Sequence, residues 1–178
     1  MDDDRRRWDD RYSAAVPVEP SPPKGLDPAW LAATGTALDV ACGLGGQAVW
    51  LARRGLSVDA LDISPRAVDA ARRLAEAHGV ADGLDARTVD LDHGLPDHLR
   101  AAYDVVVCQR FRDPRLYGQL IERVAPGGLL VMTVLSAVGA PVVGPFHAPA
   151  GELRSAFGSY RLLVDEEASG EATVVIRR

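Results

Sequence analysis

The chain has 178 residues and a formal net charge of −5 at pH 7. One domain of this length buries an independent core, but it leaves no room for a nucleotide-binding domain plus a separate substrate domain. The negative charge argues against a general nucleic-acid or anionic-membrane surface, and no apolar run reaches membrane-spanning length. Because the N-terminus also lacks a signal-peptide core, we expect a cytoplasmic protein with its two cysteines reduced.

The N-terminal part differs in composition from the rest. A cluster of aromatic, acidic and basic residues between Trp8 and Tyr12 favours a short helix docked on the domain by its two aromatic side chains. Residues 16–28 are proline-rich without periodicity, which indicates an extended linker that crosses the surface. We expect residues 1–35 to cover the ligand site built by the domain at residues 36–178.

The central pattern begins with an apolar run at residues 36–42, which predicts a buried strand. Gly43 and Gly45 follow at once, and the missing Cβ atoms allow a sharp turn and a close approach of a ligand. Helical spacing at residues 47–54 and a second strand that ends at Asp62 complete a βαβ unit. The ligand site of such a unit lies at the carboxyl ends of its strands.

Two ligand classes fit this unit. The pattern G-x-G-x-x-A from Gly43 to Ala48, with Asp62 about twenty residues on, fits a dinucleotide. S-adenosylmethionine (SAM) fits as well, because Asp62 can accept hydrogen bonds from the ribose hydroxyls of either ligand. Asp39 lies within the first strand, where a carboxylate suits an ammonium and a sulfonium but repels a pyrophosphate. The N–H groups that open the helix can receive the carboxylate of the ligand.

The remaining chain continues as alternating elements. Helices are predicted at residues 65–78 and 116–124, and strands at 84–91, 103–108 and 129–135. Residues 136–149 are predicted to form a loop beside the pocket, followed by a short helix at 151–157. Residues 160–167 and 172–178 are predicted to form a hairpin about Ser169-Gly170. The sequence predicts an α/β fold with a mostly parallel sheet, a C-terminal antiparallel hairpin and helices on both faces.

Several segments carry a family resemblance. They are LDVACGLGGQAVWLARRG, ALDIS, Trp8-Asp9-Asp10-Arg11-Tyr12, Val89-Asp90-Leu91, Pro126-Gly127-Gly128, Pro145-Phe146 and Gly151-Glu152-Leu153. On them the chain resembles a class I SAM-dependent methyltransferase, and more narrowly it is similar to the small tellurite-resistance-B (TehB-like) methyltransferases. The resemblance implies a Rossmann-like sheet, SAM as cofactor, S-adenosylhomocysteine (SAH) as product, and methyl transfer. The lack of a substrate domain favours a small-molecule acceptor.

The cofactor contacts follow from the strand ends and the resemblance. Arg11 or Tyr12 is expected to meet the methionine carboxylate, unless the helix only docks on the domain. Asp90 is expected to accept from the adenine amino group, or alternatively to form a turn. The full expected set is Arg11, Asp39, Cys42, Gly43, Gly45, Asp62, Ile63, Asp90, Leu91, Cys108 and Gln109.

The catalytic groups stay open. A soft nucleophile needs no base, whereas a hydroxyl or amine needs one, for which His147, Tyr12 and Tyr103 are the candidates. A loop histidine such as His147 is more often structural. Cys42 and Cys108 lack metal-ligand spacing, and they are expected to be apolar filler, pocket lining or a redox-linked pair.

Two other functions compete with methyl transfer. A non-catalytic SAM-binding module is suggested by the absence of an obvious base. A small NAD-binding oxidoreductase is disfavoured, because no Tyr-x-x-x-Lys pair is present and the sole lysine is Lys24. We expect no metal, no nucleic-acid or membrane partner, and either a monomer or a homodimer.

Overall fold

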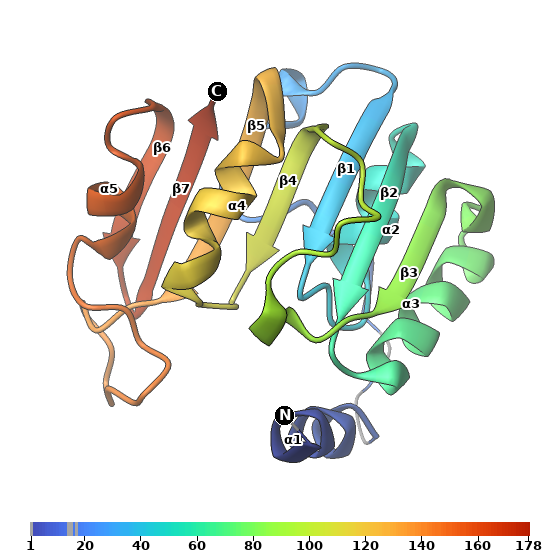
Figure 1. Cartoon of the computed structure of the whole chain (residues 1–178), viewed down its shortest axis with the longest axis horizontal. Helices are drawn as coiled ribbons and strands as arrows, with labels where there is room; N and C mark the ends of the chain where they lie inside the picture. Colours follow the sequence, from blue (N-terminus) through green and yellow to red (C-terminus); the bar gives the residue numbers. More distant parts are fainter. Residues whose placement is uncertain (1, 14–15, 17) are drawn as a thin grey trace.

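The computed structural model describes residues 2–13, 16 and 18–178, so Pro17 of the expected linker lies outside them. These residues contain one seven-stranded sheet in the order β3-β2-β1-β4-β5-β7-β6 (Figure 1). Its strands are β1 (Gly35–Val40), β2 (Leu56–Asp62), β3 (Leu84–Thr88), β4 (Tyr103–Gln109), β5 (Val124–Leu135), β6 (Arg161–Ala168) and β7 (Glu171–Arg177). Strands β1 to β5 pair in parallel, and β7 is antiparallel to both β5 and β6. The predicted mostly parallel sheet with an antiparallel hairpin is confirmed.

Helices cover both faces of the sheet, as predicted. They are α1 (Asp2–Ser13), α2 (Gly46–Arg53), α3 (Pro65–Ala77), α4 (Tyr117–Glu122) and α5 (Glu152–Phe157), with 3-10 turns η1 (Pro28–Trp30), η2 (Ala81–Gly83), η3 (Leu91–His93) and η4 (Pro114–Leu116). Leu51 of α2 and Val68 of α3 share a core cluster on one face. Leu120 of α4 and Phe157 of α5 belong to the cluster on the other face. Both faces are therefore buried, as parallel strands require.

Local sequence accounts for the start of α3. Ser64 precedes the helix in an extended conformation, and its hydroxyl accepts the backbone N–H of Ala67 at 3.2 Å. Pro65 occupies the first helical turn, where its missing N–H costs nothing. The cap places the end of β2 and the beginning of α3 side by side at the edge where the parallel strands end.

Two predicted boundaries are wrong. Strand β3 ends at Thr88 rather than Leu91, because Asp90 Oδ1 accepts the backbone N–H of Asp92 at 3.0 Å and opens the η3 turn. Strand β5 begins before the Pro-Gly-Gly segment, at Val124, because that residue already pairs with β4. The other predicted elements begin and end within a few residues of their observed positions.

The chain ahead of β1 packs onto the sheet. Leu26 is buried in the same core cluster as α2 and α3. A Cβ on Gly25 would lie 2.9 Å from the Thr173 side chain of β7, so the backbone there touches the sheet. In the part of the chain that the structure describes, no helix is long and apolar enough to cross a membrane.

Candidate functional site

The glycine-rich loop connects the end of β1 to the beginning of α2. Ala41, Gly43 and Gly45 have φ values of 57°, 53° and 82°, so the backbone turns sharply within five residues. A Cβ on Gly45 would lie 2.5 Å from Ala71 Cβ of α3, whereas a Cβ on Gly43 would lie 3.1 Å from the Tyr12 hydroxyl of α1. Gly45 therefore allows two helices to approach, and Gly43 allows α1 to lie against the loop.

The Asp62 carboxylate lies at the end of β2 and faces this loop. Its Oδ2 accepts the backbone N–H of Gly43 at 2.8 Å, and its Oδ1 accepts that of Ser64 at 2.9 Å. Burial raises the pKa of this carboxyl above its ordinary value, while the N–H groups of Ser64, Gly43 and Ile63 oppose the shift. Each oxygen keeps a lone pair for a ligand hydroxyl.

The Asp39 carboxyl lies on β1 and is almost completely buried. Its Oδ2 has no hydrogen-bond partner. Burial is the main cause that raises its pKa to about 8, the negative charge of Asp62 adds to the shift, and the N–H of Ala48 opposes it. A carboxyl in this setting is largely protonated at neutral pH and becomes charged when a cation binds beside it.

The Gln109 side chain ends β4, next to β1. Its Oε1 accepts the backbone N–H of Lys24 at 3.3 Å, which leaves the amide nitrogen to point the other way. That Nε2 atom is buried and has no partner. Asp39 pairs with Val107, so Asp39 and Gln109 lie on the same sheet face, two residues apart on neighbouring strands.

Helix α1 lies at the edge where the parallel strands end (Figure 1). The Ser64 hydroxyl donates to the Asp9 carboxylate, which joins α1 to α3. Trp8 stacks on Tyr12 with 5.8 Å between the ring centroids, and the Arg11 guanidinium lies 5.3 Å from the Trp8 ring. Burial, followed by the charge of Asp62, raises the pKa of Tyr12, so its hydroxyl keeps its proton. Tyr12 is thus a hydrogen-bond donor at the loop.

Another segment reaches the same helix. The Arg7 guanidinium lies 5.2 Å from the ring of Phe146, in the loop that follows β5. The base of this loop is tied down, because the backbones of Ala148 and Leu135 are joined by a 2.7 Å hydrogen bond. Its tip exposes large apolar side chains, with Val142 77%, Val143 58% and Phe146 56% exposed. Loop and helix together flank the end of β4.

His147 closes a turn in that loop. The backbone N–H of Gly144 donates to His147 Nδ1 at 3.0 Å. Nδ1 also lies 3.2 Å from Gly144 O, so the tautomer decides whether this nitrogen accepts or donates, and a ring protonated on Nδ1 leaves Nε2 as an acceptor. A role of His147 as base stays a prediction.

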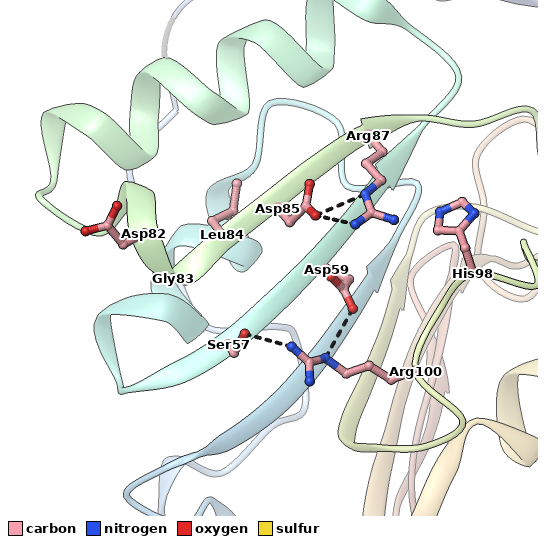
Figure 2. Close-up of a pocket in the computed structure, with 9 residues that line it drawn as sticks. All are labelled: Ser57, Asp59, Asp82, Gly83, Leu84, Asp85, Arg87, His98 and Arg100. Atoms are coloured by element: carbon pink, nitrogen blue, oxygen red, sulfur yellow. Dashed lines mark hydrogen bonds and ion pairs between the residues drawn. The ribbon is translucent and has the colours of Figure 1, made fainter.

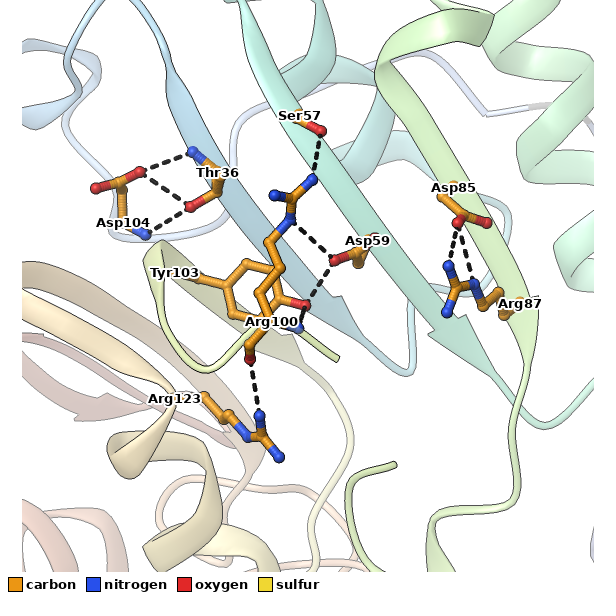
Figure 3. A network of polar contacts seen from close by, with 9 residues as sticks. All are labelled: Thr36, Ser57, Asp59, Asp85, Arg87, Arg100, Tyr103, Asp104 and Arg123. Carbon is orange, nitrogen blue, oxygen red and sulfur yellow. Dashed lines mark hydrogen bonds and ion pairs between the residues drawn. The ribbon is translucent and has the colours of Figure 1, made fainter. Parts of the chain in front are cut away.

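Tyr103, one of the candidate bases, lies at the opposite end of its strand from the candidate site. Tyr103 is the first residue of β4, whereas the candidate site lies at its last. Its hydroxyl donates to Asp59 Oδ2 at 2.6 Å and accepts the backbone N–H of Arg100 at 3.1 Å (Figure 3). Burial and the bond to Asp59 raise the pKa of Tyr103. This residue anchors the crossover into β4, and it is no candidate base.

The two cysteines do not form a pair. Cys42 belongs to the core cluster beneath α2, and Cys108 to the cluster beneath α4, so the sheet separates them. Both thiols are buried, and burial raises the pKa of each. A redox-linked pair is therefore wrong, both side chains pack in the core, and the cofactor contacts expected for Cys42 and Cys108 remain predictions.

Asp90 and Leu91, which are expected to contact the adenine, follow β3. Val89 N–H donates to Asp62 O at 2.8 Å, so the chain still follows β2 as far as Asp90. Asp90 is the turn-forming aspartate described above, and Leu91 is buried in the core. The contacts expected for Asp90 and Leu91 remain predictions.

A cavity of about 290 Å³ lies elsewhere, on the face of β2 and β3 (Figure 2). It is lined by Ser57, Asp59, Asp82, Gly83, Leu84, Asp85, Arg87, His98 and Arg100. Its charges largely satisfy one another, because Arg87 pairs with Asp85 and Arg100 lies 3.5 Å from Asp59. The cavity sits near the amino ends of the strands, so it is separate from the candidate site.

Known proteins with a similar sequence or fold include methyltransferases. A family profile described as "Methyltransferase domain" matches residues 37–128, just over half of the chain. The chain also resembles the crystal structure of TehB from Haemophilus influenzae, with a TM-score of 0.72 and 15% identity, over 96% of this chain and 67% of that one. At such low identity this likeness concerns the fold alone.

Two curated relatives align with parts of the chain. One is "Ubiquinone biosynthesis O-methyltransferase, mitochondrial" of Schizosaccharomyces pombe, 34% identical over 106 residues, which cover 56% of this chain and 37% of that protein. The other is "Ribosomal RNA small subunit methyltransferase C" of Chromohalobacter salexigens, 33% identical over 139 residues, which cover 72% of this chain and 37% of that protein. The chain thus matches little more than a third of the length of these relatives.

Proposed function

The chain belongs to the methyltransferase domain family, and from that premise we propose that it binds SAM and transfers the methyl group to a small, largely apolar acceptor. The observation that carries the proposal is a pair of buried polar atoms. Among the described residues, Asp39 Oδ2 and Gln109 Nε2 are the buried side-chain nitrogen and oxygen atoms without a partner. They lie on one sheet face, on the neighbouring strands β1 and β4.

The head of an α-amino acid complements these two atoms. Its ammonium donates to the Asp39 carboxylate, and its carboxylate accepts from the Gln109 amide. Methionine within SAM presents such a head, whereas a dinucleotide would place phosphates beside two aspartates, Asp39 and Asp62. The residues present therefore fit SAM better than NAD.

The other parts of the cofactor meet residues around the same edge. Asp62 is suited to the ribose hydroxyls, because it faces the loop and keeps free lone pairs. Asp90 and Leu91 follow β3, where the adenine is expected. The Tyr12 hydroxyl of α1 lies against the loop and can donate to the cofactor carboxylate, whereas the Arg11 guanidinium lies on the Trp8 ring and would have to turn to reach it.

Methyl transfer from SAM requires few catalytic groups from the protein. When bound, SAM supplies a methyl group that its sulfonium makes electrophilic. The chain then has to hold a nucleophile in line with that methyl group and exclude water. Helix α1 provides the cover, since Tyr12 lies against Gly43 and Asp9 is bonded to Ser64.

The acceptor side supports a small apolar molecule. Residues 136–150 contain no Asp, Glu, Lys or Arg, and the loop exposes Val142, Val143 and Phe146. An RNA acceptor would call for a basic surface, which the net charge of −5 disfavours. An acceptor that ionises by itself, such as a thiol or an acidic phenol, would need no base from the chain.

Calorimetry separates the ligand classes. We expect SAM and SAH to bind with dissociation constants in the micromolar range or below, and NAD to bind at least about tenfold more weakly, because phosphates meet carboxylates. Absence of SAM binding, or tighter binding of NAD, would overturn the proposal.

SAH formation with a panel of alkyl thiols, aryl thiols, phenols, tellurite and a ribosomal RNA fragment tests the acceptor class. Turnover of the apolar thiols or phenols is expected. SAM binding without product on the whole panel would favour a non-catalytic SAM-binding module.

A further inference from the structure

We propose that Glu171 is a positioning residue that fixes the Gln109 amide for the amino-acid part of the cofactor. It acts from the start of β7 through Lys24 and Arg110. The inference rests on the proposed function, because it assigns a ligand to the Gln109 donor. It concerns four residues in three segments that are remote from one another along the chain.

The Glu171 carboxylate holds two cations at once. Its Oε2 accepts from Lys24 Nζ at 2.6 Å, and its Oε1 accepts from Arg110 Nε at 2.9 Å and Nη2 at 2.6 Å. The Glu171 side chain is only 17% exposed, whereas those of Lys24 and Arg110 are 49% and 72% exposed. The bond from Lys24 is the main cause that lowers the pKa of Glu171, and Arg110 adds to it. The carboxylate is therefore charged across the neutral range.

Both cations adjoin Gln109. The backbone N–H of Lys24 donates to Gln109 Oε1, and the side chain of the same residue donates to Glu171. Glu171 therefore holds the residue that orients the Gln109 amide. If the Lys24 N–H moved away, no contact among the described residues would distinguish the oxygen of the Gln109 amide from its nitrogen. The Lys24 contact thus decides which end of the amide is offered to a ligand.

Arg110 holds the other side. It follows β4 with φ at 59°, a left-handed conformation that residues other than glycine rarely adopt. Its backbone N–H donates to Thr133 O at 2.7 Å, and its guanidinium donates to Glu171. The residue that follows Gln109 is therefore held to β5 by its backbone and to β7 by its side chain.

Two ligands that differ in the amino-acid head distinguish a misdirected Gln109 amide from a general loss of stability. The Gln109 donor is assigned to the carboxylate of the amino-acid head, which SAH carries and 5′-methylthioadenosine lacks. A change that only loosens the fold weakens both ligands equally. A change that misdirects the amide weakens SAH alone.

The test compares the affinities of SAH and 5′-methylthioadenosine, measured by calorimetry, in Glu171→Gln and Lys24→Met. We expect each variant to bind SAH about three- to tenfold more weakly, the scale of one ordinary hydrogen bond, with 5′-methylthioadenosine changed by less than about twofold. Lys24→Met removes only the charged group of a half-exposed side chain, so the variant should fold. It therefore tests the inference even if Glu171→Gln folds poorly. Gln109→Leu should erase the preference for SAH, and Glu171→Gln should then add no further loss.

A matched ion pair between α5 and the same hairpin supplies the control. Asp165 of β6 pairs with Arg154 of α5 at 2.7 Å, with side chains 18% and 70% exposed, close to the values for Glu171 and Arg110. Asp165→Asn should leave the ratio of the two affinities unchanged. Equal loss of both ligands in Glu171→Gln and Lys24→Met, or no loss of either, would overturn the inference. Failure of the unmodified protein to bind either ligand would instead overturn the proposed function.

Discussion

The backbone N–H of Gly43 donates to Asp62 Oδ2 at 2.8 Å, so that the end of β2 holds the first turn of the glycine loop in place. The second oxygen of the same carboxylate accepts from Ser64 N–H at 2.9 Å, at the start of α3. One buried side chain therefore sets the geometry of both segments that border the proposed cofactor site. The same carboxylate is the group expected to meet the ribose.

Replacement of Asp62 should consequently affect binding and stability together. Asp62→Ala is expected to weaken SAM binding by roughly 1–3 kcal/mol, the scale of hydrogen bonds to a charged acceptor. It also leaves the N–H groups of Gly43 and Ser64 without their partner, which should lower the free energy of unfolding by about 1–3 kcal/mol. Calorimetry and urea unfolding measure the two effects, and unchanged SAM affinity in a folded variant would remove Asp62 from the site.

Local patterns in the sequence suffice for the βαβ unit that carries this carboxylate. The helix predicted at residues 47–54 is observed at Gly46–Arg53, and Asp62 ends its strand as predicted. Such patterns succeed because apolar spacing, glycine and a cap are all properties of neighbouring residues. The predicted end of the third strand at Leu91 was wrong for a reason that is also local. The Asp90 side chain accepts the backbone N–H of Asp92 and so starts a turn where the strand was expected to continue.

Long-range pairings could not be predicted in this way. Lys24 and Glu171 are 147 positions apart, and no periodicity connects a linker residue with the start of the last strand. Asp9 and Ser64 are 55 positions apart and meet only because α1 lies across the edge of the sheet. Tyr103 shows the limit of a residue type as a signal: a tyrosine can serve as a base, but its position at the beginning of β4 keeps the hydroxyl away from the candidate site.

The raised pKa of Asp39, about 8, predicts how stability changes with pH. A carboxyl whose pKa is higher in the folded state binds a proton more tightly when folded, so the folded state carries the extra proton between the unfolded value near 4 and about 8. Across that window the Asp39 contribution to the free energy of unfolding falls as pH rises. The slope is about 1.4 kcal/mol per pH unit.

Asp39→Asn should remove this contribution. In ligand-free protein we expect the variant to gain stability relative to the natural chain as the pH is raised from 5 to 8, measured by urea unfolding at each pH. The same variant should bind SAM more weakly, because the ammonium loses its carboxylate partner. A stability difference that does not change with pH would show that Asp39 is ionised throughout this range.

The bond between Asp9 and Ser64 predicts how α1 controls access. Asp9→Ala should release α1 from α3, raise hydrogen exchange in residues 2–13 and speed dissociation of SAH several-fold, with less than about 1 kcal/mol lost from the free energy of unfolding. Asp10→Ala, on the exposed side of the same helix, is the matched control and should leave both rates unchanged. Equal SAH dissociation rates in the Asp9 variant and in the unmodified protein would exclude a gating role for α1.

Substitution of Gly45 tests whether the packing of α2 against α3 requires glycine at this position. A Cβ at this position would lie 2.5 Å from Ala71 Cβ, and φ is +82°, so Gly45→Ala combines overpacking with backbone strain. We expect a loss of about 2–4 kcal/mol in the free energy of unfolding. Gly79→Ala is the control, because φ is +68° there and no atom lies within 4 Å of the new Cβ, so only the strain of about 1–2 kcal/mol remains.

The contact partner identifies the cause of the loss. If the clash with Ala71 is the larger part, Ala71→Gly should partly rescue Gly45→Ala, with a coupling of at least about 1 kcal/mol in a double-mutant cycle. Rescue remains partial, because Ala71 Cα still lies 2.8 Å from the new Cβ. Additive losses would instead mean that the loop, rather than the approach of α2 to α3, sets the need for glycine at this position.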